Sequence, residues 1–375
     1  MRNFREKISP IIEKTGSCTP LTAHQAVSGQ PRKMMPRPFI VPLFIPHRGC
    51  PHRCVFCNQT SITGLKDGTR SQQEVRDRIT QFLGFRGAHR GTTEVAFYGG
   101  NFLGLPKAYR KLLLEEAQFF VAKGQVDGIR FSTRPETVTA AALKELASYT
   151  IRTIEVGAQS MNDTVLALSQ RGHTGADTKR AVQVLKPCNV QVGLQIMPGL
   201  PGATAESILE TGQQVAALRP DFVRIYPTVV VKNTALERWY ESGRFTPLSL
   251  SEAVELTKRL YVHFKAVGIP VIRMGLQPSS SLRARGQVVA GPFHPAFGHL
   301  VQSALFLDLA TQALASEKGL SRRVTVKVYP SDVPKLVGQK RENIRRLVAR
   351  FHLERLQVLP DVTVPENTVE VINRT

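Results

Sequence analysis

The sequence predicts an α/β fold built on a parallel sheet, because short apolar runs alternate with longer helical patterns. Parallel strands joined by helices need right-handed crossovers, which leaves an open barrel or a doubly wound sheet. Near-continuous apolar strands such as FIVPLFI fit a sheet that is covered on both faces. Six strand–helix repeats are too few for a closed eight-stranded barrel. In either open architecture, functional residues gather at the carboxyl ends of the strands.

Six runs rich in β-branched and aromatic residues are the predicted strands. They cover residues 39–45, 93–99, 128–133, 152–157, 190–197 and 221–227. Helical patterns are expected near residues 72–84, 107–122, 137–147, 175–186, 204–217 and 250–267. The last helix is the best defined, because Ser249 and Glu252 have capping-box spacing and Gly268 and Pro270 follow its end.

Three regions of different character divide the chain. Residues 1–38 are basic and lack clear periodicity, so we expect an irregular arm. Residues 39–300 carry the strand–helix repeats. Residues 301–375 are expected to form a helix followed by a small basic α/β domain, with RVTVKVYP and RLQVLP as its strands.

The composition excludes a membrane-spanning protein and favours a polyanionic partner. No apolar run reaches the ~18 residues that a membrane span needs. The charged start of the chain has no apolar stretch of a secretory signal, so a cytoplasmic location is expected. The whole chain has 50 Lys and Arg against 29 Asp and Glu, a net charge of +21, which raises the expectation of a nucleic-acid partner.

Three of the five cysteines lie together in GCPHRCVFC, directly after the first predicted strand. Clustered cysteines in a reducing compartment indicate metal binding or catalysis rather than disulfides. A fully ligated 4Fe–4S cluster takes four thiolates, so Cys50, Cys54 and Cys57 would leave one iron open. An open iron can bind a small molecule by its amine and carboxylate. The alternative is structural zinc with His47 or His52 as the fourth ligand, although the usual second ligand pair is missing.

The spacing C-x-x-x-C-x-aromatic-C, with Phe56 as the aromatic residue, resembles the signature of radical S-adenosylmethionine (SAM) enzymes. The resemblance implies a 4Fe–4S cluster whose open iron chelates SAM, and it places Phe56 near the adenine. It also implies an electron donor, such as flavodoxin or ferredoxin, and release of a 5′-deoxyadenosyl radical. The fold that follows is a partial (βα)6 radical SAM barrel with a small basic C-terminal α/β domain.

The stretch FYGGNF at the end of the second predicted strand resembles the Gly-Gly motif of the same family. The resemblance implies that Gly99 and Gly100 expose backbone to the methionine group of SAM, since glycine allows close approach. Asn101 stands where many members have Glu or a small polar residue, and it is included among the expected cofactor-binding residues.

Four later motifs resemble the radical SAM half of the Elongator catalytic subunit and its bacterial relatives. They are IEVGAQS, QRGHT, QIMPGLPG and RIYPTVVVKNTALERWYESGRF. The resemblance implies that Glu155, Gln159 and Arg171 face the SAM pocket, and a guanidinium fork at Arg171 suits the SAM carboxylate. His173 is interpreted as structural.

This sequence also departs from the Elongator subunit. Its cysteine spacing is more compact, and the 75 residues after residue 300 are too few for an acetyltransferase fold. The acyl-transfer half of the Elongator reaction is therefore not implied for this chain.

The stretch VGQKRENIRRL resembles the turn and helix of a KH module, in which a Gly-x-x-Gly loop clamps nucleic-acid backbone. Gly338 occupies the first glycine position, and Arg341 stands at the second. We therefore predict RNA contacts from Gly338, Lys340, Arg341, Arg345 and Arg346. The alternative is a solvated basic helix on a small structural cap.

Three functional hypotheses follow from these patterns. The favoured one is a radical SAM enzyme that modifies RNA, with a tRNA base as the first candidate. The second keeps the enzyme but replaces RNA with a small metabolite or tetrapyrrole, because oxygen-independent coproporphyrinogen oxidases share the compact cysteine spacing. The third is an RNA-binding protein with a non-catalytic iron–sulfur cluster.

Overall fold

The computed structural model describes residues 38–60, 70–87, 91–284 and 286–372. The predicted basic arm, residues 1–38, lies outside this part of the chain except for its last residue. Within the described ranges, no helix is long and apolar enough to cross a membrane.

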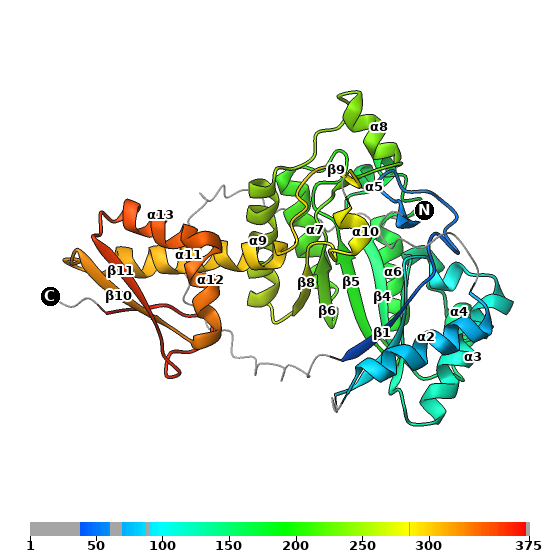
Figure 1. Cartoon of the computed structure of the whole chain (residues 1–375). Helices are drawn as coiled ribbons and strands as arrows, with labels where there is room; N and C mark the ends of the chain where they lie inside the picture. Colours follow the sequence, from blue (N-terminus) through cyan, green and yellow to red (C-terminus); the bar gives the residue numbers. More distant parts are fainter. Residues whose placement is uncertain (1–37, 61–69, 88–90, 285, 373–375) are drawn as a thin grey trace, which may run out of the picture. The chain divides into compact units, whose positions relative to one another are not determined.

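Seven parallel strands form one sheet in which each strand lies beside the next one along the chain (Figure 1). The strands are β1 (Phe39–Phe44), β2 (Thr93–Tyr98), β3 (Gly128–Thr133), β4 (Ile151–Gln159), β5 (Gln191–Ile196), β6 (Phe222–Ile225) and β8 (Val271–Met274). A doubly wound sheet reverses its strand order at a switch point, and this sheet does not. The sheet is therefore the curled half-barrel that the α/β pattern allowed, and the predicted fold class is confirmed.

The seventh strand, β8, was not among the six predicted strands. It contains only the four residues VIRM after Pro270, and its partly exposed pattern gives too little periodicity to identify a strand. Pairing with β6, in the register Val223↔Val271, makes it a strand. The last strand of the half-barrel is therefore determined by its pairing with β6 and not by its own sequence.

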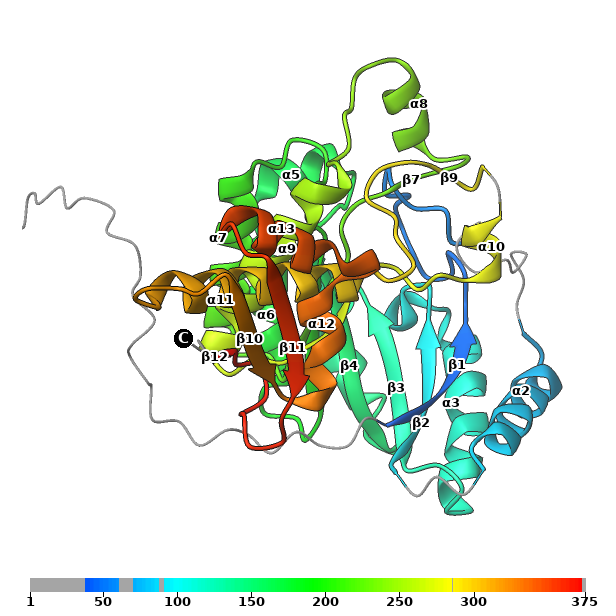
Figure 2. The ribbon, with the colours of Figure 1, turned by 60° about the vertical axis from the view of Figure 1, so that its left-hand side comes forward.

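Helices connect the strands and cover the outer face of the sheet (Figures 1 and 2). They are α2 (Gln72–Phe85), α3 (Lys107–Ala122), α4 (Ala140–Lys144), α5 (Asp163–Leu168), α6 (Gly175–Leu185), α7 (Ala205–Ala217) and α9 (Leu250–Ala266). The predicted capping box of α9 is present: the Ser249 hydroxyl accepts from the Glu252 backbone N–H at 3.2 Å, and the Glu252 carboxylate accepts from the Ser249 backbone N–H at 2.8 Å.

A stack of three fully buried phenylalanines supports the carboxyl edge of β2 and β3. The Phe97 and Phe102 ring centroids lie 5.0 Å apart, and those of Phe102 and Phe131 lie 4.6 Å apart. Buried aromatic pairs of this kind stabilise by about 0.5–1.5 kcal/mol beyond their area burial. Because Phe102 directly follows the Gly-Gly-Asn stretch, the stack fixes the backbone on which the cysteine loop rests.

A short antiparallel pair and two small helices lie in the long connections after β6 and β8. They are β7 (Val230–Val231), β9 (Val288–Ala290), α8 (Ala235–Glu241) and α10 (Ser280–Arg283). Val230 pairs with Ala290, so residues far apart in sequence form one small sheet.

The C-terminal residues form a second, three-stranded sheet with its own apolar core. Its elements are α11 (Phe297–Ser316), β10 (Arg323–Val328), α12 (Val333–Val337), α13 (Glu342–Arg350), β11 (Arg355–Pro360) and β12 (Glu370–Ile372). β10 pairs in parallel with β11 and antiparallel with β12. The expected domain boundary at residue 300 falls inside α11, whose Phe297 and Phe306 belong to different apolar clusters.

Candidate functional site

The three clustered cysteines lie on the loop that follows β1, at the carboxyl edge of the sheet. The backbone N–H of Ile45 donates to Tyr98 O at 2.8 Å, and that of Asn101 donates to Arg48 O at 2.8 Å. Farther along the loop, the Val55 N–H donates to Ser169 O at 3.2 Å. The loop is therefore held by the ends of β1 and β2 and by the segment after α5.

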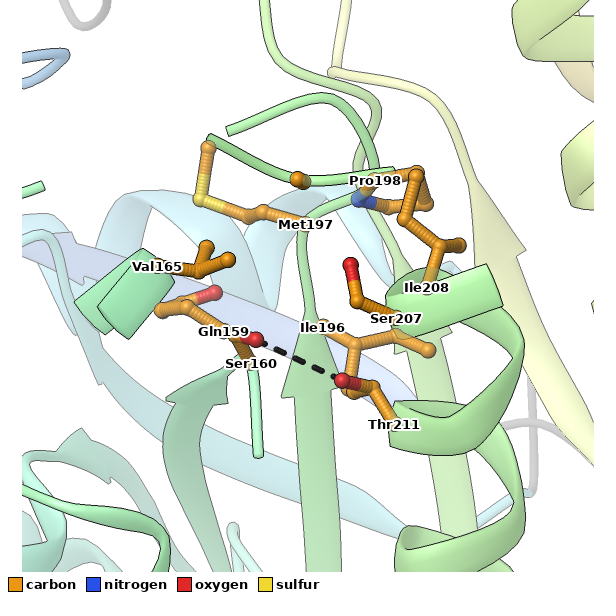
Figure 3. Close-up of a pocket in the computed structure, with 10 residues that line it drawn as sticks. Gln159, Ser160, Val165, Ile196, Met197, Pro198, Ser207, Ile208 and Thr211 are labelled. Atoms are coloured by element: carbon orange, nitrogen blue, oxygen red, sulfur yellow. Dashed lines mark hydrogen bonds between the residues drawn. The ribbon is translucent and has the colours of Figure 1, made fainter. Parts of the chain in front are cut away.

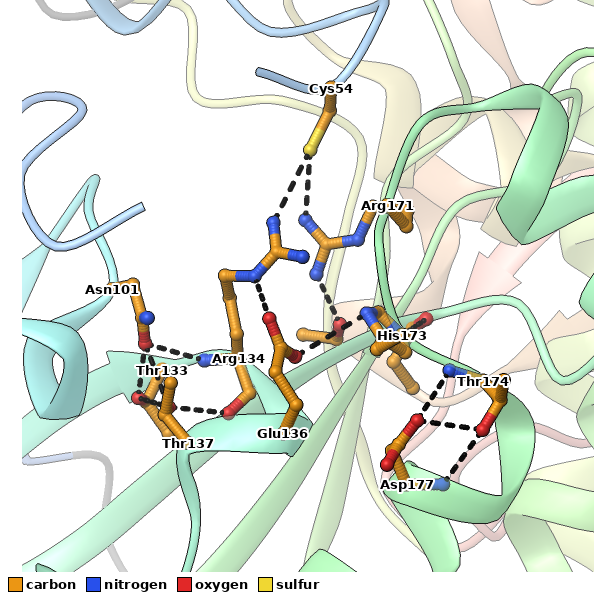
Figure 4. Close-up of polar contacts among 12 residues, drawn as sticks. Cys54, Asn101, Thr133, Arg134, Glu136, Thr137, Arg171, His173, Thr174 and Asp177 are labelled. Atoms are coloured by element: carbon orange, nitrogen blue, oxygen red, sulfur yellow. Dashed lines mark hydrogen bonds and ion pairs between the residues drawn. The ribbon is translucent and has the colours of Figure 1, made fainter. Parts of the chain in front are cut away.

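Asn101 is the polar centre of this attachment and is fully buried. Its Nδ2 donates to Gly49 O at 2.8 Å. Its Oδ1 accepts from Thr133 Oγ1 at 2.7 Å, from the Arg134 N–H at 3.0 Å and from Thr137 Oγ1 at 3.0 Å (Figure 4). The side chain thus ties the cysteine loop to the end of β3, a scaffold role that sequence reasoning did not assign.

The adjacent glycines are required by this packing. Gly99 has a φ of +94°, which only glycine adopts without strain. A Cβ on Gly100 would lie 2.5 Å from the carbonyl oxygens of Arg48 and Ile45. In this structure the cysteine loop is the segment that approaches the Gly-Gly backbone closely. The exposure of this backbone to SAM stays a prediction.

Two guanidinium groups converge on the Cys54 sulfur (Figure 4). Arg171 Nη1 lies 3.3 Å from Cys54 Sγ, and Arg134 Nη1 lies 3.7 Å from it. Arg171 also donates through Nη2 to Gly157 O at 2.7 Å, and Arg134 Nε pairs with Glu136. Both arginines are buried, so their positive charges act on the cysteine loop with little screening by water.

Arg171 and Gln159 meet over a glycine of β4. A Cβ on Gly157 would lie 2.8 Å from Gln159 Nε2 and 3.3 Å from Arg171 Nη2. Gln159 ends β4 in a left-handed conformation, with a φ of +67°. The structure therefore brings together Arg171, Gln159 and the cysteine loop, three of the sequence-predicted features.

Gln159 also lines a small cavity of about 10 Å³ (Figure 3). Ile196, Met197 and Pro198 of the QIMPGLPG motif form another wall. A space of this size holds about one water molecule. The cavity itself is too small for adenosine, and the expected lining of the adenosine site by this motif stays a prediction.

A larger cleft of about 460 Å³ opens beside Cys50. Its lining consists of the cysteine loop and one residue that precedes α3: His47, Arg48, Gly49, Cys50, Arg53 and Pro106. Small-molecule sites typically occupy about 300–1,000 Å³. The cleft therefore has the volume for a small molecule next to a candidate cluster ligand.

Glu155 lies in a buried ion network inside the half-barrel. Its carboxylate accepts from Arg130 Nη1 at 3.1 Å and from Arg224 Nη2 at 2.9 Å, and Tyr98 OH donates to it at 3.2 Å. Arg130 also pairs with Glu94 at 2.6 Å. These contacts join β2, β3, β4 and β6 by their side chains, so the observed partners of Glu155 are internal. Its predicted role toward SAM is not among these contacts and stays a prediction.

Phe56 packs against the segments that follow β6 and α10. It joins an apolar cluster with Val55, Val230, Leu236 and Phe245, and the Leu236 N–H donates to Val55 O at 2.8 Å. The α8 region therefore covers one side of the cysteine loop. Contact between Phe56 and the adenine of SAM stays a prediction.

His173 is buried in the second layer behind Cys54. Its Nε2 lies 3.2 Å from Ala158 O, and its Nδ1 lies 3.6 Å from Glu136 Oε2. Burial, followed by the neighbouring charge of Arg171, lowers the pKa of His173 to about 3. A ring that stays neutral and buried agrees with the structural role interpreted from the sequence.

The two histidines considered as a fourth ligand of zinc are engaged in other contacts. Among the described side chains, no group of three or more His, Cys, Asp or Glu is arranged around a single metal ion. His47 Nε2 accepts from the Gln59 N–H at 2.9 Å, and His52 packs against Gly172, so both candidate fourth ligands of zinc have other contacts.

The charges around the loop also suit an anionic group. Burial raises the pKa of Cys57 to about 12, and the neighbouring Cys54 and Cys50 add to this shift. Metal binding must therefore displace protons from the thiols. Arg134 Nη2 and Arg171 Nε are buried and have no hydrogen-bond partner within the described residues, and a cluster with its ligands would supply acceptors there.

Sequence reasoning missed several polar residues of this region. They include Arg134, Glu136, Arg130 and Arg224. For the first two a signal was available, because RPE directly follows the third predicted strand. Residues at that position share the carboxyl edge with the cysteine loop.

Comparison with known families agrees with the fold and the loop. The radical SAM superfamily profile matches residues 44–215, and the radical SAM C-terminal domain matches residues 220–306. The chain belongs to the radical SAM superfamily, and it is accordingly an enzyme of the class that uses a 4Fe–4S cluster and SAM.

Its relatives include proteins of the Elongator type. The tRNA uridine(34) acetyltransferase of Dehalococcoides mccartyi is 26% identical over 230 residues, which are 53% of this chain and 50% of that protein. Human Elongator complex protein 3 is 28% identical over 260 residues, covering 57% of this chain and 47% of that protein. The solved structure of Methanocaldococcus infernus Elp3 has a TM-score of 0.53 at 25% identity, covering 62% of this chain and 58% of that one. This chain spans about half the length of the curated relatives it matches.

We predict that Asn101→Ala destabilises the protein and impairs iron loading. The substitution removes one donor and three acceptor contacts in a buried site, which should lower the free energy of unfolding by about 3 kcal/mol. Urea titration and iron analysis after anaerobic reconstitution measure both effects. Asn162→Ala, which removes the cap of α5, is the control and should cost about 1 kcal/mol with full iron loading. Equal iron loading in both variants would contradict the scaffold role.

We predict that Cys54→Ala prevents assembly of the cluster, because two thiolates remain where the site offers three. Iron and sulfide analysis should show the loss of four irons per chain. Cys188→Ala is the matched control, since the Cys188 thiol donates to Val184 O on α6. Retention of four irons in the Cys54 variant would remove it from the ligand set.

We predict that His173 makes the metal-free protein sensitive to mild acid. Its pKa is about 3 when folded and 6.5 when unfolded, so between these values the unfolded state binds more protons. Stability should therefore fall as the pH drops below about 6.5, by about 2 kcal/mol at pH 5.

Urea titrations at pH 7.5 and pH 5 test this prediction. His173→Gln should lose less stability over that interval than the wild type. His352→Gln, which changes an exposed histidine, should behave like the wild type. An unchanged acid loss in the His173 variant would assign the sensitivity to other groups.

Proposed function

We propose that this radical SAM enzyme acts on RNA, with tRNA as the first substrate to test. The observation that carries the proposal is the basic loop and helix of the C-terminal sheet, residues 338–350. The relative from Dehalococcoides mccartyi, named as a tRNA uridine(34) acetyltransferase, points to the same substrate class.

In this proposal Cys50, Cys54 and Cys57 hold the cluster. Arg171 and Gln159, which meet over Gly157 beside the cysteine loop, are the residues of this edge best placed to hold the polar end of SAM. The bound cluster and SAM supply a 5′-deoxyadenosyl radical once an external donor, such as flavodoxin or ferredoxin, provides an electron. The covering by Phe56 and the α8 region reduces the access of water to the loop.

The backbone of residues 338–341 supports an RNA-contacting loop. Gly338 has a φ of +72°, and a Cβ there would lie 3.0 Å from the Asn343 side chain. Lys340 and Arg341 also have positive φ values, +47° and +61°. Arg341 stands at the second glycine position of the KH-like pattern, and it adopts the left-handed conformation that glycine favours. A left-handed residue at position 341 supports the proposal, because the KH-like pattern places a glycine there.

Exposed positive charge gathers on the same loop and on α13. Lys340 and Arg341 are exposed, and the side chains of Arg345 and Arg346 are each 63% exposed. Both of these arginines pair with Glu342, which offsets one of the four charges. The remaining positive charge is suited to binding a phosphate backbone. Folding of α13 depends on its buried apolar face and does not require positive charge on its exposed face.

SAM cleavage with and without tRNA tests the proposed function. The protein is reconstituted anaerobically and reduced, and 5′-deoxyadenosine is measured by chromatography together with mass spectrometry of the tRNA nucleosides. A new modified nucleoside that depends on SAM would support the proposal. Cleavage of SAM with no change in any RNA would favour the small-metabolite or tetrapyrrole hypothesis. A cluster indifferent to SAM would favour a non-catalytic RNA-binding protein.

We predict that the double variant Arg345→Glu/Arg346→Glu weakens RNA binding at least tenfold, because it reverses two phosphate-facing charges. Fluorescence anisotropy with labelled tRNA at several salt concentrations measures this, and the variant should show a shallower salt dependence. Arg322→Glu/Arg323→Glu is the matched control, since both side chains are about 80% exposed in the same module. Equal losses in both variants would indicate non-specific charge attraction.

A further inference from the structure

Arg134 is a buried arginine with partners on three sides. It follows the last residue of β3 and is 3% exposed. Its backbone N–H donates to Asn101 Oδ1 at 3.0 Å, its Nε pairs with Glu136, and its Nη1 lies 3.7 Å from Cys54 Sγ (Figure 4). The backbone contact fixes where the side chain begins, and Glu136 fixes its direction.

The remaining nitrogen shows that this arrangement is incomplete. Arg134 Nη2 is buried and has no hydrogen-bond partner among the described residues. A buried N–H donor without an acceptor is costly, so such atoms are rare unless a ligand supplies the acceptor. The guanidinium points toward Cys54, so the missing partner is expected on the cluster side of the loop.

We propose that Arg134 is a positioning residue that raises the reduction potential of the cluster held by Cys54, and that Glu136 opposes it. This inference rests on the assignment of Cys54 as a cluster ligand in the proposed function. Arg171 also reaches Cys54 Sγ, through Nη1, and its Nε has no hydrogen-bond partner among the described residues, so we assign Arg171 to the polar end of SAM. The two guanidiniums on one sulfur would thus serve different groups.

The sign of the effect follows from charge. Adding one electron makes the cluster and its thiolates more negative, so a nearby positive charge and a hydrogen bond to sulfur favour the reduced form. The Arg134 guanidinium supplies both. The Glu136 carboxylate carries the opposite charge, and it pairs with Arg134 and lies 3.6 Å from the His173 ring. Because both groups are buried or nearly so, their fields are weakly screened.

The experiment measures the midpoint potential of the full-length reconstituted protein without SAM. Dithionite titration in the presence of mediators is followed by electron paramagnetic resonance of the reduced cluster. Arg134→Gln should shift the midpoint to a lower value, and Glu136→Gln should shift it to a higher value. Arg76→Gln is the matched control, because Arg76 pairs with buried Glu116 on the outer helices at 3.0 Å, and it should leave the midpoint unchanged.

Opposite shifts in the two variants would support the proposal, since a merely structural role does not change sign with the charge removed. An unchanged midpoint in Arg134→Gln with four irons present would overturn it, as would shifts of the same sign in both variants. If Arg134→Gln loads no iron, the Glu136 variant decides: a higher midpoint supports the proposal and any other value overturns it. Loss of iron in both variants would assign the pair to folding and also overturn it.

If the proposed function is wrong, the experiments give results that differ from those that would overturn the role of Arg134. Four irons in Cys54→Ala would remove the ligand assignment on which this inference rests. Absence of any RNA product would leave the potentials and their interpretation untouched.

Discussion

The attachment of the cysteine loop to the carboxyl edge of the sheet is the constraint on which the site depends. One buried amide, Asn101, holds the loop by Gly49 and holds the end of β3 by Thr133 and Arg134. Glycine at position 100 lets the loop backbone approach. The phenylalanine stack beneath makes this edge rigid, so the position of the thiols is set by the half-barrel rather than by the loop alone.

That attachment also determines the electrostatics. The same Asn101 that holds the loop accepts from the backbone of Arg134, whose side chain then reaches Cys54. Arg171 reaches the same sulfur from the segment after α5. Three thiolates close together, with Cys54 buried, would be unfavourable without compensating charge, and two guanidiniums from different elements supply it. The contacts that hold the cysteine loop in place therefore also position a positive charge beside its thiols.

Much of this could be predicted from the sequence, because alternating apolar strands and helices and the spacing of three cysteines are local signals. The strand β8 could not, since its four residues become a strand only by pairing with β6. Arg134 was missed although it directly follows a predicted strand, because that position does not show that the fold buries its side chain. Glu155 pairs with Arg130 and Arg224, which lie on two other strands. These contacts could not be predicted, because they depend on the curvature of the sheet.

The C-terminal loop shows the limit of reading motifs by residue identity. Arg341 replaces the second glycine of a Gly-x-x-Gly pattern, which argues against a nucleic-acid clamp if glycine itself is required. The backbone at Arg341 is left-handed, a conformation that glycine adopts freely and that costs an arginine a modest strain, and the position carries a positive charge. In the proposed binding to RNA, a charged side chain in this conformation would contact phosphate where glycine only permits its approach. The degenerate motif is therefore compatible with stronger, more salt-dependent binding to RNA, which is the behaviour that the charge-reversal variants would detect.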